Sequence, residues 1–191
     1  MHLKLYLIII SICSLLTSLF TSIYYDLSFI YVLSVMWIGI ILVIIIDGLT
    51  ATICRLLPKR IADFNKKIYL VNKKEKVFYE KIKIKKWKEK IPEIGHFTGF
   101  RKNKISEPKN KEYIYRFLIE ICYGELGHFI SIFTGLILLF IPFFKPIWLI
   151  LSIIIIIVNA FLNLLPVFVL RYNSFTLLLL YKHLIKLENK G

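Results

Sequence analysis

Cysteine is rare in this sequence, which has three among its 191 residues. Cys13, Cys54 and Cys122 are an odd number at wide spacing, so the chain shows neither a disulfide framework nor the paired spacing typical of a zinc site. We predict that the chain binds no metal ion and that the cysteines pack as small apolar side chains.

Acidic residues are few as well. Asp and Glu number 12 against 26 Lys and Arg, which gives a formal net charge of +14. Hydrophobic residues make up 58% of the chain, above the roughly 45–50% typical of soluble domains. This composition excludes an ordinary soluble enzyme and indicates an integral membrane protein.

Four apolar segments are each about 20 residues long, the length that a helix needs to cross a hydrocarbon core of roughly 30 Å. They cover residues 5–25, 27–46, 126–144 and 147–170, and residues 143–146 form the tight connection between the last two. We therefore predict an all-α integral membrane protein with four transmembrane helices. The pattern divides the chain into a helical hairpin at 1–58, a loop at 59–115 and a second helical hairpin with a tail at 116–191.

The first apolar segment also has features of a signal peptide, because the small residues Thr17, Ser18, Thr21 and Ser22 resemble a cleavage region. Its apolar run is longer than the 7–15 residues typical of a signal peptide, which favours a retained anchor. Whether residues 1–22 are cleaved stays open.

The loop between the second and third segments carries most of the positive charge. From Lys59 to Glu112 there are 18 Lys and Arg against 7 Asp and Glu, a net of +11. The positive-inside rule therefore predicts a multi-pass protein of the cell membrane with this loop and both termini in the cytoplasm. Aromatic residues among the lysines indicate an interfacial segment that attracts anionic lipid headgroups, at about 1 kcal/mol per basic residue. We expect no nucleic-acid partner.

Glu120, Glu125 and His128 lie where the third apolar segment begins. Charged side chains in a membrane span cost roughly 2.5–3.5 kcal/mol on insertion scales and are usually functional. Glu125 and His128 are three residues apart, on one face of a helix. A carboxylate that orients an imidazole and raises its basicity is suited to general base catalysis.

A second polar group lies at the end of the fourth segment. Asn159 and Asn163 are four residues apart, and Arg171 and Asn173 follow. Arg171 is suited to a phosphate or carboxylate, and the asparagines to hydroxyl groups or an oxyanion. The alternative is structural, with hydrogen bonds between helices from the asparagines and an arginine that anchors the helix end.

Three motifs occur in an order that resembles one enzyme family. They are KWKEKIPE at 86–93, E-x4-E-x2-H from Glu120 to His128, and N-x7-RYN from Asn163 to Asn173. Over about residues 76–180 the chain resembles the glycosyl-4,4'-diaponeurosporenoate acyltransferases, small bacterial membrane proteins assigned to the last step of staphyloxanthin-type carotenoid biosynthesis. The resemblance implies transfer of a fatty acyl group onto a sugar hydroxyl of a glycosylated polyprenoid or glycolipid.

Under this resemblance, Glu125 and His128, together with Glu120, are the expected catalytic residues. The expected substrate-binding residues are Asn163, Arg171, Asn173, Lys85, Trp87 and Lys88. The expected acyl donor is acyl-CoA or acyl carrier protein, with no bound cofactor. Dimerisation of the chain stays open, as does the involvement of a carotenoid.

Two other classes of protein stay open. One is a different membrane enzyme that modifies lipids with the same Glu and His. The other is a non-catalytic membrane subunit or small transporter. The distinguishing feature is whether Glu125 and His128 line a pocket or pack against another span.

Overall fold

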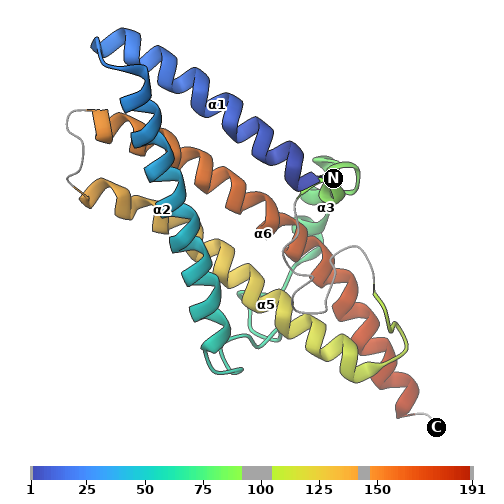
Figure 1. Cartoon of the computed structure of the whole chain (residues 1–191). Helices are drawn as coiled ribbons and strands as arrows, with labels where there is room; N and C mark the ends of the chain where they lie inside the picture. The colour runs from blue at the N-terminus through green and yellow to red at the C-terminus, as the bar shows by residue number, and fades with distance from the viewer. Residues whose placement is uncertain (1, 92–104, 142–146, 190–191) are drawn as a thin grey trace. The chain divides into compact units, whose positions relative to one another are not determined.

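The computed structural model of the chain describes residues 2–91, 105–141 and 147–189 (Figure 1). All regular secondary structure in these ranges is helical, which confirms the predicted all-α class. The predicted connection at 143–146 and the last two residues of the KWKEKIPE motif lie outside the described residues. The division of the chain at residues 58 and 115, drawn from composition, stays a prediction.

Four helices are long and apolar enough to cross a membrane, as predicted. They are α1 His2–Tyr25, α2 Phe29–Leu56, α5 Lys111–Thr134 and α6 Ile147–Glu188, and the 3-10 helix η3 Gly135–Phe140 continues α5. Three of them extend well beyond the apolar segments: α2 past residue 46, α5 upstream of residue 126, and α6 past residue 170. Hydropathy marks only the part of a helix that crosses hydrocarbon, whereas the backbone hydrogen bonding continues into the polar residues at its ends.

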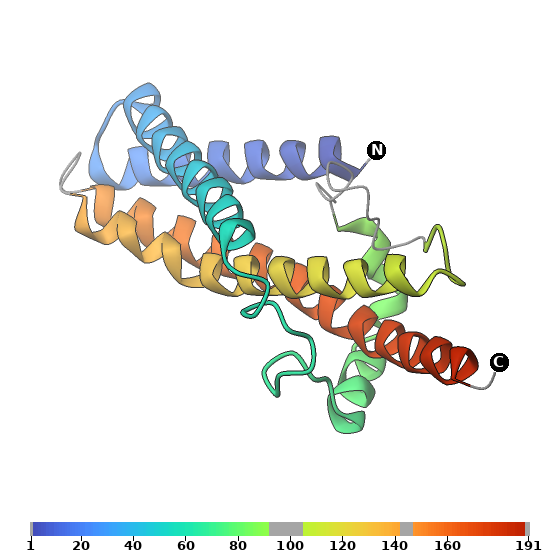
Figure 2. The ribbon, with the colours of Figure 1, turned by 90° about the horizontal axis from the view of Figure 1, so that it is seen from below.

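The basic loop also contains short helices, namely α3 Lys73–Lys81, α4 Ile84–Trp87 and the 3-10 helix η1 Lys88–Lys90. Asn72 caps α3, because its side-chain oxygen accepts a hydrogen bond from the Glu75 N–H at 2.9 Å. In two views α3 lies beside the C-terminal part of α6 (Figures 1 and 2). The structure thus gives this segment short helices, whereas its interfacial position stays a prediction.

The chain forms two compact units. Unit 1 comprises Met1–Thr50 and Ile130–Asn163, and unit 2 comprises Ala51–Phe129 and Leu164–Gly191. The core of unit 1 consists of apolar side chains from α2, η3 and α6, including Val35, Leu138 and Leu151. Trp148 in this core donates its indole N–H to the Leu138 carbonyl at 2.8 Å, which satisfies a backbone group near the end of η3.

One face of α1 is built from small polar residues that are buried in unit 1. Ser14, Ser18, Thr21 and Ser22 are all below 8% exposed. Ser14 and Ser22 donate their hydroxyl groups to backbone carbonyls three residues earlier, which removes the cost of placing a hydroxyl in an apolar environment. Three of the four small residues that resemble a signal-peptide cleavage region, Ser18, Thr21 and Ser22, therefore have a packing role in this structure.

Unit 2 is held together by the early part of α5 and the late part of α6. Their buried residues include Ile114, Leu118 and Leu177. The phenol of Tyr123 donates to the Leu57 carbonyl just after α2 ends, at 2.8 Å. Gly127 lets α5 approach α2 closely, since a Cβ added there would lie 3.7 Å from the Cα of Ala51.

This close approach predicts how substitutions at Gly127 behave. Gly127→Ala should be tolerated, because the added Cβ makes an ordinary contact with Ala51. Gly127→Leu should destabilise the protein by about 1–3 kcal/mol, because the longer side chain meets the backbone of α2. The thermal midpoints of both variants in one detergent check this, and equal midpoints would contradict the close contact.

Candidate functional site

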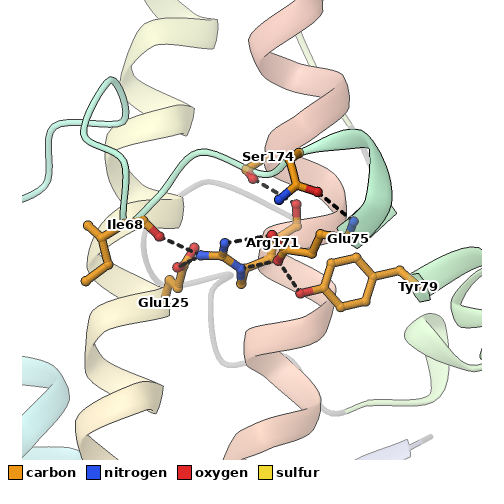
Figure 3. Close-up of polar contacts among 7 residues, drawn as sticks. Ile68, Glu75, Tyr79, Glu125, Arg171 and Ser174 are labelled. Atoms are coloured by element: carbon orange, nitrogen blue, oxygen red, sulfur yellow. Dashed lines mark hydrogen bonds and ion pairs between the residues drawn. The ribbon is translucent and has the colours of Figure 1, made fainter. Parts of the chain in front are cut away.

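The guanidinium of Arg171 on α6 is the centre of a polar cluster in unit 2 (Figure 3). Arg171 Nε donates to Glu75 Oε1 at 2.5 Å, and Nη2 donates to Glu75 Oε2 at 3.0 Å. This bidentate pair joins α6 to the short helix α3. A planar guanidinium matches the two oxygens of a carboxylate, so the pair is specific in geometry as well as in charge.

The remaining contacts of Arg171 reach two further segments. Nη1 donates to the Ile68 carbonyl at 2.8 Å and also to Glu125 Oε1 on α5. One cation therefore faces two carboxylates, and the side chains of Arg171, Glu75 and Glu125 are only 17%, 22% and 8% exposed. With both carboxylates ionised the cluster has a net charge of −1.

Glu75 is fixed from within its own helix as well. Tyr79, one turn later on α3, donates its hydroxyl to Glu75 Oε1 at 2.6 Å. Burial by itself would raise the pKa of Glu75, but hydrogen bonds from Arg171 and Tyr79 and the charge of Arg171 outweigh it, so the pKa lies below its usual value. Burial, and then the hydrogen bond to Glu75, raise the pKa of the Tyr79 hydroxyl. Glu75 is therefore held as a carboxylate and Tyr79 as a neutral donor.

Only one of the two carboxylate oxygens of Glu125 has a hydrogen-bond partner among the described residues. Its Oε1 accepts from Arg171, whereas Oε2 is buried and has no hydrogen-bond partner among the described residues. Glu125 also lines a cavity of about 10 Å³ together with Tyr69, Cys122 and Ser174. That volume is about what one water molecule or one hydroxyl group needs. Glu125 thus has one acceptor oxygen without a partner in the described part of the chain, and it lines a small cavity.

The other predicted catalytic residues lie on the same helix. His128 follows Glu125 by one turn of α5 and is half-buried. Glu120 forms an ion pair with Arg55 of α2, with 3.8 Å between Glu120 Oε2 and Arg55 Nε. The two glutamates are therefore bound by different arginines, and the pairing of Glu125 with His128 stays a prediction.

Part of the predicted substrate-binding group meets where the basic loop contacts α6. Lys88 Nζ donates to Asn173 Oδ1 at 3.3 Å and lies 5.8 Å from the centre of the Tyr172 ring. Trp87 donates its indole N–H to the Ile82 carbonyl at 2.9 Å, which fixes the short helix α4. Lys85 lies on the same helix and is exposed. The structure thus brings Lys88 and Asn173 together.

Asn163 belongs to a separate polar network within unit 1. Its Nδ2 donates to Asp47 Oδ2 at 2.9 Å, and to the backbone and side-chain oxygens of Asn159 at 3.1 and 3.0 Å. Thr134 donates its hydroxyl to Asp47 Oδ1 at 3.1 Å, and Asn159 donates to the Ser131 carbonyl at 3.0 Å. A carboxylate on α2 is thus bound from both α5 and α6.

Sequence reasoning missed Asp47 and Glu75. The predicted apolar segment ends at residue 46, one residue before Asp47, and its composition gives no role to that carboxylate. An ionisable residue within a span is nevertheless itself a sign of function. Glu75 was hidden among lysines, but Asn72 followed three residues later by Glu75 matches the pattern of a helix start. Neither signal names the partner of the carboxylate.

Four apolar helices and a buried, ion-paired polar cluster define the class: an integral membrane protein with a polar site among its helices. The family model of glycosyl-4,4'-diaponeurosporenoate acyltransferase matches residues 62–183, more than half of the chain, and the chain belongs to this family. Membership supports acyltransferase activity and a place in carotenoid biosynthesis. No curated protein and no solved structure matches the chain.

The Arg171 cluster predicts a large difference between two glutamates of α3. Glu75→Ala leaves a mostly buried guanidinium with fewer partners and should destabilise the protein by roughly 3 kcal/mol. Glu80→Ala removes only an exposed ion pair with Lys76 and should cost less than about 0.5 kcal/mol. Unfolding of both variants in the same detergent measures this, and similar losses would show that the Glu75 pair is not needed for stability.

Proposed function

We propose that this protein is a membrane-bound acyltransferase that moves a fatty acyl group from a cytoplasmic thioester to a sugar hydroxyl of a glycosylated lipid or carotenoid. The observation that carries the proposal is the family match over residues 62–183. This segment contains the buried Glu125 and the half-buried His128 and Arg171. A polar site within apolar helices suits a reaction whose acceptor diffuses in the membrane.

In the proposed reaction, His128 accepts the proton of the sugar hydroxyl while its oxygen attacks the carbonyl carbon of the thioester. A C–O bond forms, and the tetrahedral intermediate collapses with cleavage of the C–S bond. The thiolate then takes the proton from His128, so the site returns to its starting state. Glu125, one turn away on α5, stabilises the imidazolium, and the unpaired Oε2 supports this role. Glu120 adds a negative charge on the same helix.

The geometry favours a positioning role for Arg171. Its N–H groups donate to Glu75, Glu125 and the Ile68 carbonyl, so its charge is used within the protein. We assign to it the orientation of Glu125, whose Oε1 it binds. Recognition of an anionic donor falls instead to lysines of the basic loop.

Lys85, Lys88 and Trp87 are the residues that we assign to the acyl donor. Acyl-CoA and acyl carrier protein both present phosphate groups, which the positive loop attracts from the cytoplasm. Lys88 binds the amide oxygen of Asn173 and so orients that side chain. We assign to the Asn173 amide nitrogen a hydrogen bond to the oxyanion of the tetrahedral intermediate.

The reaction predicts that His128→Ala abolishes product while the protein stays in the membrane. Lipid extracts from cells that express wild type or variant at equal membrane levels would be compared by mass spectrometry. The expected product is a glycolipid heavier by one fatty acyl group, present only with the wild type. His183→Ala is the matched control, since it removes an exposed histidine of α6.

Two outcomes would favour the other classes of protein. A full yield of acylated product from His128→Ala would exclude this imidazole as the base. Identical lipid profiles from wild-type and empty cells, in a host that makes the glycolipid, would favour a membrane subunit or transporter.

Donor recognition by Lys88 predicts a selective kinetic change. Lys88→Gln should raise the KM for acyl-CoA roughly tenfold, the size expected for the loss of one charge-assisted hydrogen bond. The KM for the sugar acceptor should stay unchanged. Lys182→Gln removes the same charge from an exposed position on α6 and should leave both constants unchanged. An equal rise in the KM for acyl-CoA in both variants would indicate that the positive charges attract the donor in general, and that Lys88 makes no specific contact with it.

A further inference from the structure

Asp47 is a carboxylate in the largely apolar helix α2. The 18 residues before it in α2, Phe29 to Ile46, contain no charged side chain. At a rise of 1.5 Å per residue they extend about 27 Å, close to the thickness of the hydrocarbon core. Asp47 therefore follows a stretch long enough to cross that core, within the candidate span Phe29–Leu56.

In the described part of the chain, the Asp47 carboxylate accepts hydrogen bonds from neutral side chains. Thr134 and Asn163 each donate a hydrogen bond to it, one to each carboxylate oxygen. Within residues 2–91, 105–141 and 147–189, no lysine or arginine forms an ion pair with Asp47. Two donors and no acceptor suit the ionised carboxylate.

A purely structural role does not require a charge. Each polar contact between membrane helices contributes little to stability, and neutral Asn or Ser side chains can make such contacts. A carboxylate also has about four acceptor positions, of which the protein uses two at Asp47. Because Asp47 is only half-buried, the other positions remain accessible to donors from outside the protein.

The atoms around the Asp47 carboxylate favour a sugar over a metal cation as its ligand. Asn163 directs an amide N–H to Asp47, and an N–H group cannot coordinate a cation. No group of three metal-binding side chains occurs in the described part of the chain. A sugar, in contrast, offers several hydroxyl donors on adjacent carbons, which match the free acceptor positions of a carboxylate.

We propose that Asp47 binds hydroxyl groups of the sugar head group of the lipid acceptor. Thr134 and Asn163 hold the carboxylate in place, and Asn159 in turn accepts a hydrogen bond from Asn163. The apolar chain of the acceptor lies among the apolar helices, and its sugar binds Asp47. This inference rests on the proposed function for the choice of acceptor, but sugar binding itself can be measured without the reaction.

The experiment uses the purified full chain in lipid nanodiscs, with dodecyl β-glucoside as the probe. A dodecyl polyether without a sugar is the matched ligand. Binding is followed by the ligand-dependent shift of the unfolding midpoint, and acyl transfer from acyl-CoA is measured separately. Asp47→Asn is compared with wild type and with Asp26→Asn, which removes an exposed carboxylate from the connection between α1 and α2.

The expected result is that Asp47→Asn weakens glucoside binding, and raises the KM for the glucoside, at least tenfold. Binding of the polyether, the KM for acyl-CoA and the unfolding midpoint without ligand should match the wild type. Asp26→Asn should behave as wild type throughout. Should Asp47→Asn not fold, Asp47→Ser replaces it, because its hydroxyl can still accept hydrogen bonds from the two donors.

The outcomes separate this inference from the proposed function. Glucoside binding that depends on Asp47, without acyl transfer by the wild type, would support the sugar site and contradict the acyltransferase. Acyl transfer with an unchanged glucoside KM in Asp47→Asn would support the acyltransferase and overturn the sugar site. Equal losses for donor and acceptor, or no glucoside binding by the wild type, would also overturn it.

Discussion

The pairing of Arg171 with two glutamates is the interaction on which unit 2 depends. A guanidinium that is removed from water must have its hydrogen bonds satisfied, and Arg171 finds its acceptors on α3, on α5 and at the Ile68 carbonyl. The nine residues of α3 would be marginal as an isolated helix. Its order therefore depends on the Asn72 cap and on contacts with α6, of which the Glu75 pair is the strongest.

The same interaction determines what Glu125 can do. Arg171 shares its charge between two carboxylates, and the bidentate geometry goes to Glu75. Glu125 receives a hydrogen bond on one oxygen, its other oxygen has no hydrogen-bond partner among the described residues, and the residue lines a cavity of about 10 Å³. A carboxylate with both oxygens hydrogen-bonded to the protein would have no acceptor left for a substrate or an imidazolium. A carboxylate with one hydrogen-bonded oxygen is fixed in position, and its other oxygen can accept a hydrogen bond from an imidazolium or a hydroxyl group.

Hydropathy was sufficient to predict four spans, because the apolar length of a membrane helix is set by the bilayer. It was not sufficient for the helix ends, where hydrogen bonding and amphipathic packing take over, as in the long extension of α6. The sequence also placed Glu125 and His128 on one helix, and Arg171 and Asn173 just after the end of another span. It did not supply the partners: Arg171 meets Glu75 from 96 residues away, and no local spacing encodes such a contact.

The two substrates of the proposed reaction require binding residues of opposite charge. A phosphate-bearing donor requires cations, whereas a sugar requires acceptors for its hydroxyl groups. A lysine and a carboxylate at one site would bind each other, as Arg171 and Glu75 do, and would lose capacity for both ligands. Within unit 1, Asp47 contacts neutral donors, and within unit 2, Lys88 contacts a neutral asparagine. Under our proposal, each of these residues keeps its charge for a ligand of the complementary kind.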